Sequence, residues 1–163
     1  RRPGAVPPYM ADERWALLPQ TPVARLGLSV EVWAASEDLT EDTAADCYVR
    51  TTRDSFVSVF DVRADGPIRR VFPAEGRGPE FVRGAQAVRF SHRAAKRNGA
   101  SYATNVDGLW AVATLVDIPL EVGRLTGPEA ARRIHGVMSR LSSDDWAASS
   151  YKYRVRPAGR RRP

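Results

Sequence analysis

Two histidines and one cysteine are the side chains of this chain best suited to nucleophilic chemistry. Such chemistry needs a nucleophile, a base beside it and a third group that orients the base, and no Gly-x-Ser-x-Gly turn surrounds any serine. His92 precedes a polar segment, which favours a solvated surface imidazole over a general base. His135 falls beside the apolar stripe of a predicted helix, where we expect partial burial. Cys47 is alone, and we expect a small buried side chain.

Metal and cofactor sites lack the spacing that they require. Zinc sites bring histidine and cysteine ligands together, whereas these residues lie far apart in this sequence. Asp144 and Asp145 are adjacent acids, but the spacing of a calcium loop is absent. The run Gly76-Arg77-Gly78 is too short to cradle a phosphate. We therefore predict no metal site and no cofactor.

Paired carboxylates could perform glycoside chemistry if a cleft brought them together. Glu31, Asp61 and Glu80 are the candidates for such a pair. Nothing in the sequence distinguishes these three residues from charges on the protein surface. We therefore predict no catalytic residue, and an enzyme with an unrecognised site is the least favoured of three hypotheses on function.

Arginine is concentrated at the two ends of the chain. The 163 residues carry a net charge of +6, with 25 basic and 19 acidic side chains. Seven arginines lie in residues 1–9 and 154–163, which contain no acid, so the remainder has 18 basic and 19 acidic side chains. That remainder lacks the basic face of a dedicated nucleic-acid domain. Because arginine binds phosphate and carboxylate groups bidentately, the basic C-terminal end could hold nucleic acid or an acidic surface.

Alternating apolar residues predict a core of β-strands that would position these side chains. Residues 56–65 give the strongest strand signal, because β-branched and aromatic residues occur on both parities and an Asp-Gly turn follows. A strand that is apolar on both faces is typical of the centre of a sheet, and residues 108–118 share the pattern. Further strands are predicted over 26–34, 46–53, 67–72, 86–90 and 148–155, with an acidic loop over 37–43.

One amphipathic helix is predicted late in the chain. Thr126 and Glu129 have the spacing of a capping box, in which each side chain binds the backbone of the other residue. Pro128 suits the first turn of a helix. Apolar residues then recur at helical spacing as far as Leu141.

Together these elements predict the fold class and the organisation of the chain. Several short strands with turns between them, and one helix, predict an antiparallel, immunoglobulin-like β-sandwich with an amphipathic helix near the C-terminus. The sandwich is expected over residues 26–156. A proline-rich extended arm is expected over 1–25 and a basic disordered tail over 157–163.

A series of strand and turn segments carries a resemblance to a known family. The segments are Leu28-Ser29-Val30-Glu31-Val32-Trp33, Asp46-Cys47-Tyr48-Val49, Asp65-Gly66, Val71-Phe72-Pro73, Phe81-Val82-Arg83-Gly84-Ala85, Gly108–Val116 and Trp146–Val155. Their order resembles the bacterial family called domain of unknown function 4384. The resemblance implies a β-sandwich accessory domain of envelope or secreted proteins, found beside kinase or peptidase domains. It favours the periplasm or the cell surface and implies no catalytic or binding residue.

These observations favour a non-catalytic module for protein interaction or assembly in a larger bacterial complex. An exposed strand edge can add to the sheet of a partner, and the proline-rich arm could lie along a neighbour or dock on its own domain. The residues expected to contact a partner are Tyr9, Trp15, Leu17, Arg154, Arg156, Arg160, Arg161 and Arg162. The alternative is an anion-binding module that acts through the arginine-rich end. No apolar run approaches the roughly 20 residues of a membrane-spanning helix.

Overall fold

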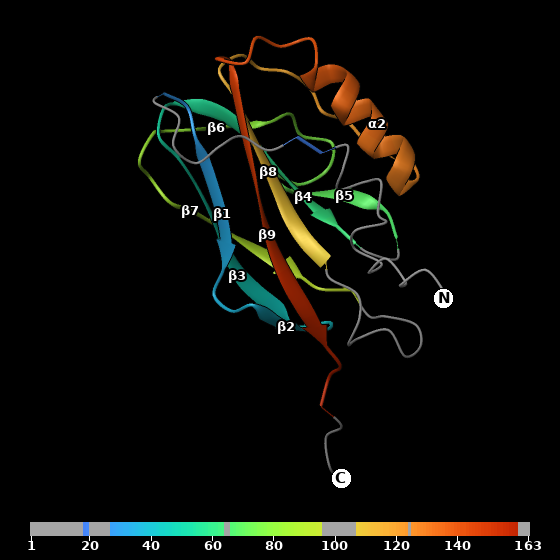
Figure 1. Ribbon diagram of the computed structural model, residues 1–163. Coiled ribbons are helices and arrows are strands. Elements are labelled where there is room, and N and C mark those ends of the chain that lie inside the picture. Colours follow the sequence, from blue (N-terminus) through green and yellow to red (C-terminus); the bar gives the residue numbers. More distant parts are fainter. Residues whose placement is uncertain (1–17, 20–26, 64–65, 96–106, 124, 160–163) are drawn as a thin grey trace, which may run out of the picture.

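Two β-sheets lie face to face, and a helix covers the outer face of the larger sheet (Figure 1). The computed structural model describes residues 18–19, 27–63, 66–95, 107–123 and 125–159. Strand order is β1–β3–β7 in the smaller sheet and β2–β9–β8–β4–β5 in the larger, where β6 also pairs with β4. The elements are β1 (Val30–Ala34), β2 (Asp38–Thr40), β3 (Ala44–Thr51), β4 (Ser55–Val62), β5 (Ile68–Phe72), β6 (Glu80–Val82), β7 (Val88–Arg93), β8 (Asp107–Thr114), α2 (Gly127–Met138) and β9 (Trp146–Arg156). The predicted β-sandwich with one helix near the C-terminus is confirmed.

Strands β4 and β8 form the centre of the larger sheet, as their apolar residues on both parities predict. All eight residues of β8 are buried, and Phe56 is the one residue of β4 that is not. Val57 and Val59 face the smaller sheet, whereas Phe60 and Val62 face the helix. Each parity therefore contributes to a different apolar cluster.

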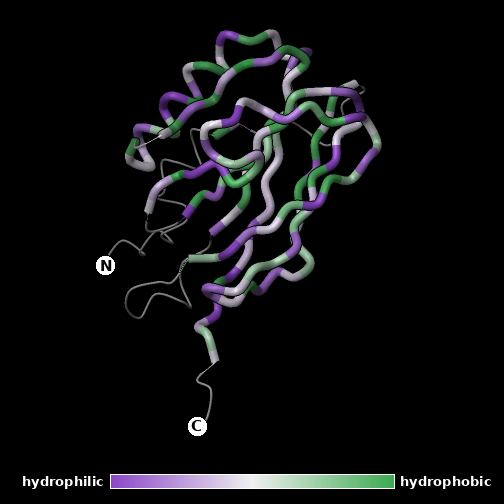
Figure 2. Tube along the Cα trace, turned by 180° about the vertical axis from the view of Figure 1, so that it is seen from behind, coloured by the Kyte–Doolittle hydropathy of each residue, from purple (hydrophilic) through white to green (hydrophobic). Residues whose placement is uncertain are grey.

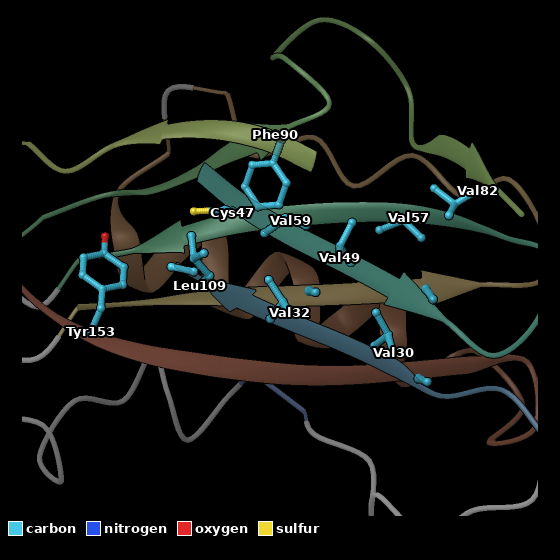
Figure 3. Close-up of a cluster of buried hydrophobic side chains, with 14 of the residues drawn as sticks. Val30, Val32, Cys47, Val49, Val57, Val59, Val82, Phe90, Leu109 and Tyr153 are labelled. Atoms are coloured by element: carbon cyan, nitrogen blue, oxygen red, sulfur yellow. The ribbon is translucent and has the colours of Figure 1, made fainter. Parts of the chain in front are cut away.

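Valine is the most frequent residue in the cluster between the sheets. Figure 3 shows Val30, Val32 and Val49 of the smaller sheet together with Val57 and Val59 of the larger one. β-branched side chains pack well on pleated surfaces. Because Cys47 is fully buried in the same cluster, the prediction of a buried cysteine is confirmed.

Several strands differ from those predicted, and two of the differences have a clear physical reason. Residues 37–43, predicted as an acidic loop, contain β2, which runs parallel to the end of β9. Leu39 is 3% exposed and holds this short strand in the core. The polar residues on either side of Leu39 give little strand signal, so the strand was not predicted. The strand predicted over 108–118 ends at Thr114, where its pairing with β9 also ends, so Val116 is 52% exposed.

The helix begins with the predicted capping box. The Thr126 hydroxyl accepts from the Glu129 amide over 3.4 Å, and the Glu129 carboxylate accepts from the Thr126 amide over 2.9 Å. Hydrophobic and hydrophilic residues alternate along this segment (Figure 2). Its buried side, which includes Ile134 and Met138, packs over the larger sheet.

Leu18 and Pro19 lie against the same face of the sheet as the helix. Leu18 is 3% exposed within the helix-side cluster. Trp110 of β8 donates from Nε1 to the Pro19 carbonyl over 2.8 Å. Two residues of the predicted proline-rich arm therefore dock on their own domain.

Loss of the cap at Thr126 should weaken the helix and the domain. The Thr126→Ala variant leaves the Glu129 amide without its partner, and we expect a loss of about 1 kcal/mol in the free energy of unfolding. Urea denaturation would measure this loss. Thr126→Ser keeps a hydroxyl and is the control. Equal stability of the two variants would contradict a role for the cap.

Candidate functional site

A buried chain of polar side chains joins the two sheets at one end of the sandwich. His92 comes from β7, Asp61 from β4 and Tyr153 from β9, and Figure 3 shows Tyr153 at the end of the core. The Tyr153 hydroxyl donates to Asp61 Oδ1 over 2.6 Å and lies 3.1 Å from His92 Nε2. Because the hydroxyl proton points to Asp61, its oxygen accepts from His92. This arrangement assigns the proton of a neutral imidazole to Nε2.

Strand alternation explains why these polar groups lie in the core. His92 follows the buried Phe90 by two residues, and Asp61 follows the buried Val59 by two. With exposures of 4% for His92 and 7% for Asp61, the predictions of a solvated imidazole and of a surface carboxylate are wrong. The sequence signal for this burial was the position of each residue, two places after a buried apolar residue of the same strand. Burial of such groups is costly unless they are hydrogen-bonded, and Tyr153 supplies the shared partner.

Burial determines the protonation of these groups. It lowers the pKa of His92 from 6.5 to about 4. Asp61 Oδ1 lies 3.6 Å from Nε2 and would favour the imidazolium, but burial is the dominant influence on this pKa. Burial, followed by the charges of Asp61 and Asp107, raises the pKa of Tyr153 well above its usual value. Burial also raises the pKa of Cys47 to about 12, so imidazole, phenol and thiol are all uncharged at neutral pH.

A cavity of about 410 Å³ lies beside the polar chain. His92 and Asp61 both line it, together with charged and polar residues from β5, β7 and the segments that follow β4 and β5. These other residues are Arg63, Arg69, Arg70, Glu75, Ser91 and Arg93. The cavity therefore combines several guanidinium groups with a buried neutral histidine.

The outer face of the smaller sheet carries a cluster of aromatic and charged side chains. Trp33 and Tyr48 are opposite each other in the β1–β3 register, and their rings stack with centroids 5.5 Å apart. The Arg50 guanidinium lies 5.7 Å from the Trp33 ring, and Arg50 Nη2 lies 2.8 Å from Glu31 Oε2. Arg89 of β7 is opposite Tyr48. We call these five residues the outer-face patch.

None of the described helices or strands covers the outer-face patch. The helix α2 instead packs on the larger sheet, on the far side of the sandwich (Figure 1). The patch is not apparent from the sequence, because Trp33, Tyr48 and Arg50 become neighbours only through the register of two strands.

The structure describes two of the residues predicted to contact a partner. Arg154 and Arg156 are exposed on β9, and Arg156 Nη2 lies 2.8 Å from Asp38 Oδ2. Such an exposed ion pair contributes little to stability. The others, Tyr9, Trp15, Leu17, Arg160, Arg161 and Arg162, lie outside the described residues. His135 is exposed on α2, one position beyond the buried Ile134, so the prediction of its partial burial is wrong.

The described residues contain neither a cluster of metal ligands nor a helix that could span a membrane. Within these ranges, no group of three or more histidine, cysteine, aspartate or glutamate side chains could hold a metal ion. Among the helical residues described, no segment has the length and apolar character needed to cross a membrane.

Comparison with known proteins gave only distant likenesses in structure. No family model matches the chain, and no curated protein matches it. A solved structure of the CARDB domain of the PF1109 protein from Pyrococcus furiosus, in complex with di-metal ions, is similar at 10% sequence identity. The match covers 78% of this chain and 91% of that chain, with a TM-score of 0.34. This likeness is too distant to carry a function or a ligand to this chain.

Proposed function

We propose that this chain is a non-catalytic β-sandwich module that binds a protein partner through its outer-face patch. The observation that supports the proposal is the stacked pair of Trp33 and Tyr48, with Arg50 over the Trp33 ring, on a sheet face that no described element covers. Tryptophan, tyrosine and arginine are the residue types most enriched at the energetic centres of protein interfaces.

The geometry of the patch also suits binding. The two rings are held at an interplanar angle of 18°, and Arg50 is held between the Trp33 ring and the Glu31 carboxylate. Side chains that are already ordered lose less conformational entropy when a partner binds. The patch therefore offers a preformed surface.

The protonation of the interior supports a non-catalytic role. His92, Tyr153 and Cys47 are uncharged at neutral pH, since burial shifts each pKa away from the charged form. A catalytic nucleophile requires activation by a base or a lowered pKa. The resemblance to domain of unknown function 4384 extends the proposal to an assembly of the bacterial envelope, which stays a prediction. Anion binding through the arginine-rich end also stays a prediction.

Photo-crosslinking in cells that express the natural full-length protein would test the proposal. A photoreactive amino acid at Arg89, which belongs to the patch, should yield a discrete adduct with a protein partner. The same group at Arg132, exposed on α2, is the matched control and should yield none. The Trp33→Ala variant should abolish the adduct formed from position 89.

The dependence on Trp33 makes the outcome specific to the patch. The same adducts from both positions, or an adduct that persists in Trp33→Ala, would contradict the proposal. Folding of the variant is checked separately by circular dichroism and urea denaturation. Because Trp33 is partly exposed, we expect this variant to fold.

A further inference from the structure

The arginine-lined cavity carries more positive than negative charge. Four arginines and two carboxylates line it, the carboxylates being Asp61 and Glu75. Arg70 is 4% exposed, and its Nη2 donates to Glu121 Oε1 over 2.9 Å. The same nitrogen also donates to the Arg77 carbonyl, so Arg70 is held by groups of its own domain. A cleft lined by more cationic than anionic side chains concentrates anions.

We propose that this cavity binds a phosphate group, either as the free ion or as the monoester of a small molecule. Arginine recognises phosphate through paired N–H donors. The volume of about 410 Å³ lies within the range of small-molecule sites. It leaves room for an organic group beside the phosphate.

Arg69 is the arginine most available to the ligand. It lies on β5, opposite Asp61 in the β4–β5 register. Its side chain is exposed, and it makes no hydrogen bond or ion pair within the described part of the chain. Arg93 of β7 also lines the cavity, but its side chain leaves the strand on the side opposite His92 and donates to the Asp42 carbonyl. Residues from both sheets thus converge on one cavity.

His92 gives the cavity a means of distinguishing phosphate from other oxyanions. Its Nε2–H is used by Tyr153, so the polar atom left on the ring is Nδ1, an acceptor without a partner in the described residues. Because Nδ1 accepts a hydrogen bond, it suits an anion that has an O–H group to donate. Monohydrogen phosphate and protonated monoesters have such a P–O–H group, whereas sulfate at neutral pH has none. The cavity is therefore selective for phosphate over sulfate.

Titration of the full chain with inorganic phosphate, glycerol 3-phosphate and sulfate would test this site. Calorimetry at pH 7 and constant ionic strength would give the affinities, and NMR would follow the His92 ring and the amides of residues 91–93. We expect saturable binding of phosphate, at least about tenfold weaker binding of sulfate, and chemical-shift changes at the cavity. Tighter binding of glycerol 3-phosphate would identify the monoester as the ligand, and tighter binding of inorganic phosphate would identify the free ion.

Three variants locate the binding. Arg69→Gln should weaken phosphate binding roughly tenfold, the effect of one lost charge-assisted hydrogen bond. Arg132→Gln, exposed on α2, is the matched control and should bind normally. A chain without residues 157–163 should also bind normally. The proposal is overturned by loss of binding on truncation, by equal affinity for sulfate, by an unchanged affinity of Arg69→Gln or by the absence of saturable binding.

Discussion

Replacement of Trp110 by alanine should lower the free energy of unfolding by about 3–5 kcal/mol, the usual cost of removing a large buried aromatic side chain. Trp110 is fully buried on β8, where it packs against Phe60 with ring centroids 5.8 Å apart. Its Nε1–H also binds the Pro19 carbonyl. The substitution therefore opens a cavity under the helix and releases the segment at Leu18.

Two comparisons separate these contributions. Trp110→Phe keeps an aromatic ring but loses the bond to Pro19, and we expect a loss of about 1–2 kcal/mol. Trp33→Ala removes a tryptophan that is partly exposed in the outer-face patch, and we expect about 1 kcal/mol from the lost ring stacking. Urea denaturation of the three variants would give the order. A loss in Trp110→Ala no larger than that in Trp33→Ala would contradict the structural role of Trp110.

The central strands were predicted well from the sequence, because strands that are buried on both faces consist mostly of apolar residues. In β4 and β8, apolar residues on both parities reflect contact with the smaller sheet on one side and with the helix on the other. The helix start was predictable for a related reason. The reciprocal bonds of Thr126 and Glu129 are local, so their spacing in sequence fixes their geometry.

The candidate sites were missed because they depend on contacts between distant segments. Asp61 and Tyr153 are 92 positions apart, and His92 and Tyr153 are 61 apart. The polar neighbours Ser91 and Arg93 suggested a surface, although they point to the other side of the strand from His92. Only the packing of one sheet on the other brings these three polar groups together.

Acidification should destabilise the domain through His92. In the folded protein its pKa is about 4, against 6.5 for an ordinary histidine, because burial disfavours the imidazolium. Between these two values the unfolded chain binds a proton that the folded chain does not. Stability therefore falls as the pH decreases from 6.5 to 4, and the contribution of His92 is constant below that range. The pKa difference corresponds to roughly 3 kcal/mol.

A comparison with His92→Gln isolates this contribution from that of the carboxylates, which also affect stability in acid. Glutamine does not titrate, and its amide can still donate to the Tyr153 hydroxyl oxygen. Urea denaturation at intervals from pH 7.5 to 4 should show the wild type losing roughly 3 kcal/mol relative to this variant. His135→Gln, on the exposed face of α2, should keep the wild-type pH dependence. Parallel curves for the wild type and His92→Gln would mean that the imidazole is not held neutral between the sheets, and the assignment of its acceptor Nδ1 to the phosphate cavity would fail with it.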